Sequence, residues 1–373
     1  MALRGIKVLE LAGLAPAPFC GMILADFGAD VLRVDKIGSD TNVDTLGNGK
    51  KSIALNLKHP DGVTIVRNLA KKSDVLIEPF RAGVMEKLGL GPDILLKDNP
   101  KLIYARMTGY GQTGPFAKSA GHDINYLALS GLLSLFGRKH EKPVFPVNYA
   151  ADFAGGGLIC ALGVTLALLE RQKSGLGQVV DSSMVEGTAY VGSFLYRSQV
   201  LPMWGRQRGE NILDTGAHFY EVYETKDGKY VSVGALEPQF YAKLVEGLGI
   251  DEDEAPHFGD FDKLKVLFEA KFREKTLEEW CAIFDGTDAC VAPVLSLEEA
   301  PKHPHNLERG SFEGGVPKPA PVLSRTPGKS KGMEKLPQVG EHTRAVLASV
   351  GYSEGDINKL VENGVIDVCK SKL

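Results

Sequence analysis

Hydrophobic positions in the first half of the chain form short runs that alternate with longer stretches of helical spacing. The short runs are rich in Val, Ile and Leu, as buried strands are. We expect strands over residues 6–11, 30–35, 52–57, 74–77, 102–107 and 178–182. We expect helices over residues 18–27, 60–70, 126–136 and 153–171. This alternation predicts βαβ units, and therefore an α/β fold with a mostly parallel sheet.

The pattern changes after about residue 190. Two runs of aromatic and β-branched residues, 219–225 and 230–235, flank a Lys-Asp-Gly-Lys turn and predict a β-hairpin. We expect later helices over residues 239–248, 263–272, 277–284, 342–350 and 353–363. The predicted organisation is a large domain over 1–190, a linker over 191–216, a small α+β domain over 217–304, a linker over 305–340 and a C-terminal segment over 341–373.

Composition narrows the classes of protein. The chain has 43 basic and 47 acidic residues, a net charge of −4 that argues against a general nucleic-acid binder. Hydrophobic residues make up 43%, which excludes wholesale disorder. The five cysteines are scattered without a C-x-x-C pair, so neither a disulfide framework nor a zinc site is predicted, and a reducing compartment fits best.

One apolar run raises the question of a membrane span. Residues 153–169 are continuously apolar, but they contain three consecutive glycines and are flanked by Asp152 and Glu170. Seventeen residues lie at the lower limit for crossing a bilayer. We therefore expect a buried core helix, and we expect no secretory signal in the first residues.

The chain is rich in glycine, with 43 of 373 residues. One glycine cluster matches the G-x-G-x-x-G pattern of dinucleotide-binding proteins. Residues 109–114 read Gly-Tyr-Gly-Gln-Thr-Gly, but Pro115 follows and no helix begins there. A dinucleotide fingerprint needs its glycines to lead into a helix, so nicotinamide or flavin binding is not expected. Such glycines still permit close approach of the backbone to another ligand.

Two clusters carry titratable side chains at the starts of predicted helices. His122 and Asp123 precede one helix, and Asp152 precedes the other. Either aspartate is also explained as an ordinary helix cap. Together, however, they place a His and an Asp at helix N-termini, where partial positive charge stabilises an anion or a developing oxyanion. The sequence alone does not place the two clusters in contact.

The last three residues, Ser371-Lys372-Leu373, match a peroxisomal address that an import receptor reads. They predict a peroxisomal location and an interaction with that receptor.

Motifs over about residues 2–350 resemble the family III CoA-transferases and their racemase branch. They are IKVLEL, APAPFCGMILADFGADVLRVD, FRAGVMEKLGLGP, IYARMTGYGQTGP, GHDINYLALSG, ADFAGGG, GQVVDSSMVEGTAY and GEHT. Three features resemble the racemase branch most closely: GHDINY, Asp152 within ADFAGGG, and GALEPQF at residues 234–240.

The resemblance implies an isomerase that interconverts the R and S forms of 2-methyl-branched fatty acyl-CoA and bile-acid-type acyl-CoA thioesters. One side chain removes the α-proton, and another returns a proton to the opposite face of the enolate. By resemblance, His122 and Asp152 are this pair, Glu237 orients His122, and Asp123 supports them. Asp152 needs a raised pKa, which burial supplies. We further expect the amides of residues 152–155 to stabilise the enolate.

The implied proton transfer needs no metal and no redox cofactor, which agrees with the lack of a convincing metal or dinucleotide motif, and CoA is part of the substrate. The resemblance implies CoA-binding positions at Lys36, Leu55, Asn56, Leu57, Lys58, Arg81, Gly121, His122, Asp123, Ile124, Asn125 and Tyr126. At position 36 the family more often has arginine, so this chain keeps the charge but loses a planar group that stacks on adenine.

The resemblance also implies an interlocked homodimer, each chain having a Rossmann-like large domain and a smaller α+β domain. Its C-terminal segment returns to the large domain, and Glu237 in the small domain implies an active site shared between subunits. A second location in mitochondria is known in the racemase branch, although no presequence is visible here.

Two other functions remain open. In a family III CoA-transferase, Asp152 is a covalent nucleophile that accepts the acyl group. His122 discriminates, because the transferase branch generally lacks histidine there. The second alternative is a non-catalytic acyl-CoA carrier on the same fold, which binds acyl-CoA without exchanging its α-proton.

Overall fold

The computed structural model describes residues 1–39, 44–251 and 253–369. The chain divides into two compact units. The first contains Met1–Ser130, Pro146–Val191 and His305–Leu373, and the second contains Gly131–Phe145 and Gly192–Pro304. The segment 131–145 therefore belongs to the second unit, whereas the sequence interpretation assigned it to the large domain.

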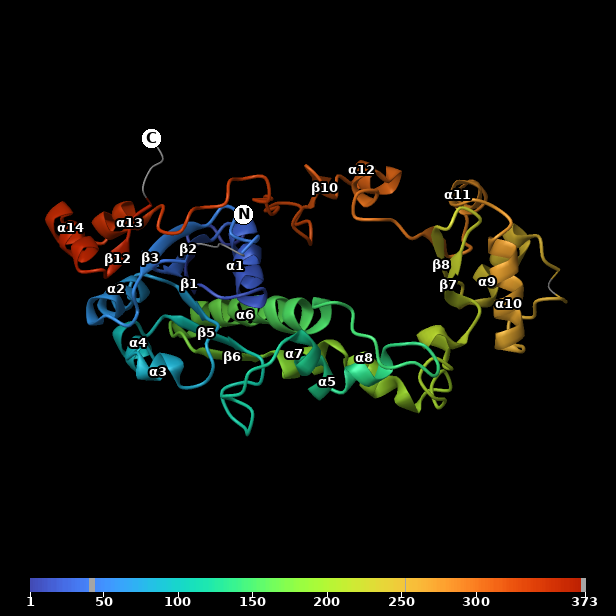
Figure 1. The fold of residues 1–373 in the computed structure, drawn as a ribbon, viewed down its shortest axis with the longest axis horizontal. Helices are drawn as coiled ribbons and strands as arrows, with labels where there is room; N and C mark the ends of the chain where they lie inside the picture. The colour runs from blue at the N-terminus through green and yellow to red at the C-terminus, as the bar shows by residue number, and fades with distance from the viewer. Residues whose placement is uncertain (40–43, 252, 370–373) are drawn as a thin grey trace. The chain divides into compact units, whose positions relative to one another are not determined.

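The first unit is built on a seven-stranded sheet in the order β12-β3-β2-β1-β4-β5-β6 (Figure 1). The strands are β1 (Lys7–Leu11), β2 (Asp30–Lys36), β3 (Lys51–Leu55), β4 (Val75–Glu78), β5 (Ile103–Thr108), β6 (Val179–Ser183) and β12 (Ile366–Asp367). All neighbouring pairs are parallel except β12 with β3. The predicted α/β class with a mostly parallel sheet is confirmed.

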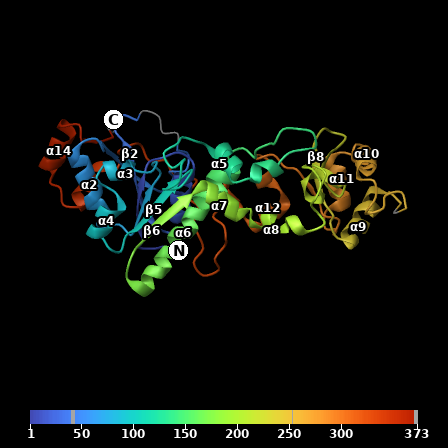
Figure 2. The ribbon, with the colours of Figure 1, turned by 90° about the horizontal axis from the view of Figure 1, so that it is seen from below.

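Helices cover both faces of this sheet (Figure 2). The helices of the first unit are α1 (Pro16–Asp26), α2 (Pro60–Ala70), α3 (Val84–Lys87), α4 (Pro92–Asp98), α5 (Asp123–Leu129), α6 (Ile159–Ser174), α7 (Met184–Val191), α13 (Thr343–Ser349), α14 (Glu354–Glu362) and α12 (Pro304–Arg309), of which α12 lies away from the sheet (Figure 1). Four of them, α1, α2, α4 and α12, begin with proline, where the missing N–H has no intrahelical partner to lose.

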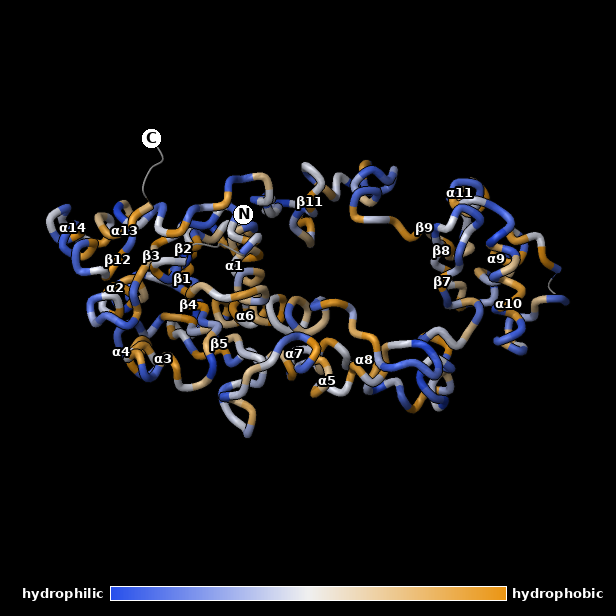
Figure 3. Tube along the Cα trace, viewed as in Figure 1, coloured by the Kyte–Doolittle hydropathy of each residue, from blue (hydrophilic) through white to orange (hydrophobic). Residues whose placement is uncertain are grey.

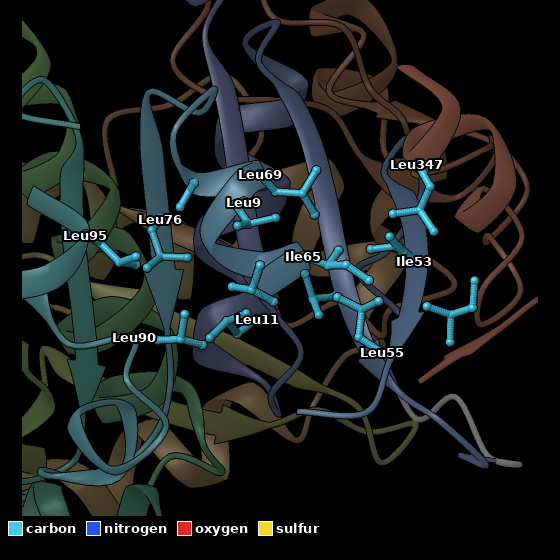
Figure 4. Packing of buried hydrophobic residues seen from close by; sticks show 14 of the residues in the cluster. Leu9, Leu11, Ile53, Leu55, Ile65, Leu69, Leu76, Leu90, Leu95 and Leu347 are labelled. Carbon is cyan, nitrogen blue, oxygen red and sulfur yellow. The ribbon is translucent and has the colours of Figure 1, made fainter. Parts of the chain in front are cut away.

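One core cluster joins early and late parts of the chain (Figure 4). Leu9 and Ile53 from the strands pack with Ile65 of α2, and Leu347 of α13 belongs to the same cluster. All four side chains are at most 1% exposed. The segment after residue 340 is therefore part of the first unit's core, and β12 extends its sheet.

The second unit is smaller and contains an antiparallel sheet of β7 (Tyr220–Glu224), β8 (Tyr230–Gly234) and β9 (Val291–Pro293). The β7–β8 register confirms the predicted hairpin. The accompanying helices are α8 (Ser193–Arg197), α9 (Pro238–Leu248), α10 (Phe261–Phe272) and α11 (Leu277–Phe284). Its core is strongly aromatic and includes Phe219, Tyr223, Phe268 and Trp280.

Several predicted bounds were wrong for local physical reasons. The helix predicted over 126–136 ends at Leu129, because Gly131 adopts a left-handed φ of 82° before a short 3₁₀ turn at Leu132–Leu135. The segment 305–338 is not only loop: it contains α12 and a ribbon of β10 (Phe312–Glu313) with β11 (Val316–Pro317). Strands β9 and β12 have three and two residues, too few for a hydrophobic period.

The long apolar helix is longer than predicted. It begins as a π-helix, η2, over Tyr149–Leu158 and continues as α6 to Ser174. Tyr149–Ser174 is long and apolar enough to cross a membrane by length and composition, and its hydrophobic colouring is visible in Figure 3. One face of α6 packs on β5 and β6 through Val164 and its buried neighbours, while Leu162 and Leu166 on the other face are about half exposed. The expected buried core helix therefore holds for one face only.

A buried histidine makes the second unit sensitive to acid. His218 is 0% exposed, and its Nε2 lies 2.8 Å from the Tyr241 hydroxyl. That hydroxyl donates its proton to the Ala255 carbonyl, so Nε2 carries the proton it shares with Tyr241. The other ring nitrogen is buried without a hydrogen-bond partner among the described residues. Burial, with smaller contributions from the nearby His257 and Lys265, lowers the pKa of His218 to about 3.

We predict that His218→Phe reduces the loss of stability in acid. A histidine with a lowered folded-state pKa stabilises the fold above its unfolded pKa of about 6.5 and loses that contribution as pH falls toward 3. The wild type should lose about 2 kcal/mol more than the variant between pH 6.5 and 5. Urea unfolding followed by tryptophan fluorescence measures this, because both tryptophans, Trp204 and Trp280, lie in the second unit.

The control is His140→Asn, since His140 is exposed and its positive φ is one that asparagine tolerates. This variant should keep the wild-type pH dependence. The same pH dependence in wild type and His218→Phe would contradict the prediction.

Candidate active site

A cavity of about 390 Å³ lies in the first unit, where the chain leaves the carboxyl ends of β1, β4 and β5. Its walls come from Ala12, Gly13, Leu14, Ala15, Pro16, Pro79, Phe80, Arg81, Met107, Thr108, Gly109 and Tyr110. The loop from Ala117 to His122, together with Tyr126, Asp152 and Met184, completes the lining. Ligands of open α/β sheets bind at this edge, which makes the cavity the candidate site.

The cavity brings together the two clusters that the sequence left apart. His122 is the N-cap of α5, and its backbone N–H donates to the Asn125 side chain at 3.1 Å. Asp152 lies in the first turn of the π-helix η2, where the Asn148 side chain donates to its carboxylate at 3.3 Å. Both side chains therefore come from helix starts that converge on one cavity.

Three consecutive glycines, which follow Asp152 by three residues, allow η2 to pack closely against its neighbours. A Cβ atom on Gly155 would overlap Thr188 of α7, and one on Gly157 would lie 2.6 Å from the Phe19 ring of α1. A Cβ on Gly156 would make tight contacts of 3.1 Å with Met184 and 3.3 Å with Pro16. The glycine run, which would weaken an isolated helix, thus lets η2 lie directly against its neighbours.

Asp123 holds the two helix starts together. It is 3% exposed, and its Oδ2 accepts the backbone N–H groups of Ala151 at 2.7 Å and Asp152 at 2.8 Å. Asp123 does not line the cavity, so the structure gives it a positioning role through the backbone. The Asp152 amide, which the sequence interpretation offered to the enolate, is donated to Asp123 instead.

The environment of Asp152 favours its protonated form. Burial is the largest cause and raises the pKa of the Asp152 carboxyl. The hydrogen bond from Asn148 acts in the opposite direction, the negative charge of Asp123 raises the pKa, and His122 lowers it. A carboxyl group with a raised pKa is suited to carry a proton in one half of a reaction and to accept one in the other.

The glycine-rich loop after β5 accommodates Tyr126. A Cβ on Gly109 would overlap the Tyr126 ring, and one on Gly121 would lie 2.7 Å from it. Tyr126 donates its hydroxyl proton to the Gly121 carbonyl, and its ring meets that of Tyr110 edge to face at 5.1 Å. Burial raises the pKa of Tyr126 to about 12. These glycines therefore serve an aromatic contact at the cavity wall.

The predicted CoA-binding residues divide into three groups. Arg81, Gly121, His122 and Tyr126 line the cavity. The α5 residues Asp123, Ile124 and Asn125 do not line it. Lys36, Leu55, Asn56, Leu57 and Lys58 lie at or just after the carboxyl ends of β2 and β3, outside the lining.

Three members of this last group have structural contacts of their own, and one of them, Leu57, packs half-buried against the core of the first unit. Leu55 is 1% exposed and packs in the core of the first unit. Asn56 uses its side chain within the fold: it accepts the Lys58 backbone N–H and donates to the Gly364 carbonyl. Lys36 and Lys58 are the two residues of this group whose positive charge can bind a phosphate.

Glu237 lies in the second unit, as the exposed N-cap of α9. It is not among the residues that line the cavity of the first unit. The predicted receptor motif Ser371-Lys372-Leu373 lies outside the described residues. Within residues 1–39, 44–251 and 253–369, no three His, Cys, Asp or Glu side chains are grouped to hold a metal ion.

The sequence interpretation missed most of the apolar lining, including Leu14, Phe80, Met107 and Met184. Leu14 and Phe80 come within three residues of the ends of β1 and β4, and Met107 is the residue before the last one of β5. Position at the carboxyl end of a parallel strand is a signal that would have found them.

The fold and the cavity define an α/β protein with a ligand site at the carboxyl edge of its sheet. The chain matches the model of CoA-transferase family III over residues 3–343. Because this match covers most of its length, the chain belongs to CoA-transferase family III.

Individual relatives agree with this assignment. The chain is 56% identical over 380 aligned positions to the alpha-methylacyl-CoA racemase of Mus musculus, covering 100% of this chain and 99% of the relative. It is 54% identical, with the same coverage, to the alpha-methylacyl-CoA racemase of Homo sapiens. A CAIB/BAIF family protein from Brucella suis has a similar structure, with a TM-score of 0.78 and 25% identity over 93% of this chain and 99% of that one.

We predict that Asp123→Ala destabilises the first unit by about 2–4 kcal/mol, because it leaves two buried amides without an acceptor. Asp123→Asn keeps one acceptor oxygen and should lose less. Urea unfolding followed by far-UV circular dichroism measures both variants. Equal stability of Asp123→Ala and wild type would show that the two amides do not depend on this carboxylate.

Proposed function

We propose that the chain interconverts the R and S forms of 2-methyl-branched acyl-CoA thioesters, including those of bile-acid type. The observation that carries the proposal is the position of His122 and Asp152 on one cavity, with burial raising the pKa of Asp152. Two relatives that share more than half of their residues with this chain are both named alpha-methylacyl-CoA racemase, which supports the same reaction.

The reaction moves one proton off a carbon and another proton onto it. The thioester carbonyl acidifies the α-carbon, and the base on one side takes its proton, leaving an enolate. The protonated group on the other side then donates its proton to the opposite face. His122 and Asp152 exchange these two roles for the two enantiomers, so each turnover leaves the site ready for the reverse reaction. An imidazole serves both roles between pH 5 and 8.

A CoA-transferase remains the alternative. In that reaction the Asp152 carboxylate attacks the thioester carbonyl, CoA leaves, and the acyl group is held as an anhydride. The succinyl-CoA–L-malate CoA-transferase beta subunit of Chloroflexus aurantiacus is 33% identical over 98% of this chain. His122 favours the racemase, since it supplies the second acid–base group that proton transfer needs and anhydride formation does not.

The remaining expectations belong to the same proposal. CoA would contact Arg81 at the cavity and Lys36 and Lys58 beyond it, and no further cofactor is required. The homodimer is supported by the half-exposed leucines of η2 and α6, Leu158, Leu162 and Leu166, which follow one another at intervals of four on one helix face. Glu237 would orient His122 in that dimer. A peroxisomal location, with a second one in mitochondria, stays a prediction from the sequence.

We predict that the wild-type protein exchanges the α-proton of a 2-methylacyl-CoA for deuterium in D₂O, observed by proton NMR. His122→Ala and Asp152→Ala should each slow this exchange by about 10²- to 10⁴-fold, the usual contribution of a positioned acid or base. His305→Ala, at an exposed position in α12, is the control and should exchange at the wild-type rate.

CoA transfer between two carboxylic acids, with a trapped acyl adduct on Asp152 and no deuterium exchange, would replace the racemase with the transferase. Binding of acyl-CoA with neither reaction would instead indicate a carrier.

We predict opposite shifts of the acid side of the pH–rate profile for two neighbours of Asp152. Asn148→Ala removes a hydrogen bond to the ionised carboxylate, so the pKa of Asp152 rises and activity is lost at higher pH. Asp123→Asn removes a negative charge, so the pKa of Asp152 falls and activity persists to lower pH. Each shift should be about half to one pH unit in kcat. Shifts in the same direction would mean that the pKa of Asp152 does not determine the acid side of the pH–rate profile.

A further inference from the structure

Arg106 lies between two carboxylates behind the cavity wall. It faces Glu78 across the parallel pair of β5 and β4, and its Nε donates to Glu78 Oε1 at 2.7 Å. Its two terminal nitrogens donate to the two oxygens of Glu86 in α3, at 2.7 and 3.2 Å. One guanidinium group thus ties the end of β4 to the helix that follows it. We call Glu78, Glu86 and Arg106 the Arg106 triad.

The segment between these two attachment points is part of the cavity. Residues 79–83 connect β4 to α3, and Pro79, Phe80 and Arg81 line the cavity. The first amide of this loop is itself held, because Phe80 N–H donates to Glu78 Oε2 at 2.9 Å. Arg81 donates to the Lys118 carbonyl at 3.1 Å, which leaves most of its five donors for a ligand.

Two members of the triad are buried, while the Glu86 side chain is 46% exposed. Glu78 is 0% exposed and Arg106 is 5% exposed. Burial raises the pKa of Glu78, while the hydrogen bond from Arg106 opposes that shift and also lowers the pKa of Glu86. A buried carboxylate of this kind requires its cation and its hydrogen bonds, so alternative positions of the guanidinium are strongly disfavoured.

We infer that the Arg106 triad is a positioning device that holds residues 79–83, and with them the Arg81 guanidinium, in place to bind a phosphate group of CoA. The inference rests on the proposed function, since it takes CoA as the ligand of this cavity. None of the three triad residues lines the cavity. The triad therefore acts on affinity for the CoA moiety and not on proton transfer at His122 and Asp152.

The test compares CoA binding by full-length wild type, Glu86→Gln and Arg106→Lys, using isothermal titration with CoA itself. Glu86→Gln keeps the shape of the side chain but removes its charge, and its partly exposed position makes it the variant that folds most safely. Arg106→Lys keeps the charge beside Glu78 but removes the link to Glu86. Both should weaken CoA binding about fivefold or more. In the racemase assay both should raise KM with kcat within about twofold.

The control is Asp98→Asn, which removes the ion pairs of Asp98 with Arg67 and Lys71 in the same unit. These residues are not part of the cavity lining. Asp98→Asn should bind CoA as the wild type does, which separates loss of an ion pair in general from loss of this one.

Arg81→Ala tests whether the triad acts through Arg81. If it does, Glu86→Gln should weaken CoA binding in the wild type but add little in the Arg81→Ala background. Additive losses, or unchanged affinity in both Glu86→Gln and Arg106→Lys, would overturn the inference. These outcomes are distinct from failure of the proposed function, in which the wild type binds CoA but exchanges no α-proton.

Discussion

The carboxylate of Asp123 is the contact on which the site depends. Its Oδ2 accepts hydrogen bonds from the backbone N–H groups of Ala151 and Asp152 in the first turn of η2. Asp123 is also the first residue of α5, the helix that His122 caps. The two groups proposed for proton transfer are thereby fixed through the backbone, by an atom that lines no cavity. Its negative charge also favours the protonated form of Asp152, so geometry and acidity are set by one side chain.

Close packing of glycine supports this arrangement. The three glycines of η2 let it lie against α1 and α7, and Gly109 and Gly121 make room for the Tyr126 ring beside the cavity. In both places a methyl group would meet backbone or a packed ring, where little can yield. The glycine richness of the chain is therefore partly a packing requirement around the site, in addition to the turns that need a positive φ.

Much of the fold could be predicted from hydrophobic runs, because β1, β3, β4 and β5 are buried along most of their length and consist mainly of apolar residues. The π-helix could not, since its spacing differs little from an α-helix over ten residues. Candidate chemistry was visible in His122 and Asp152 as residue types at helix starts. The sequence did not show that these two residues meet at one cavity, nor that Asp123 holds their helices together. Both features arise from contacts between segments about 30 residues apart. Nor does local sequence distinguish Leu55, a core residue, from a ligand contact.

The C-terminal strand has a consequence for the order of folding. β12 covers the otherwise free edge of β3, and Leu347 joins a core whose members between Leu9 and Tyr104 are made about 240 to 340 residues earlier. During synthesis the second unit emerges before that closure. Until residues 343–367 arrive, the first unit would present an open strand edge and an unfilled apolar surface, both of which promote association between chains. Such long-range closure also implies slow folding, since the intervening chain must be ordered before the last contacts form.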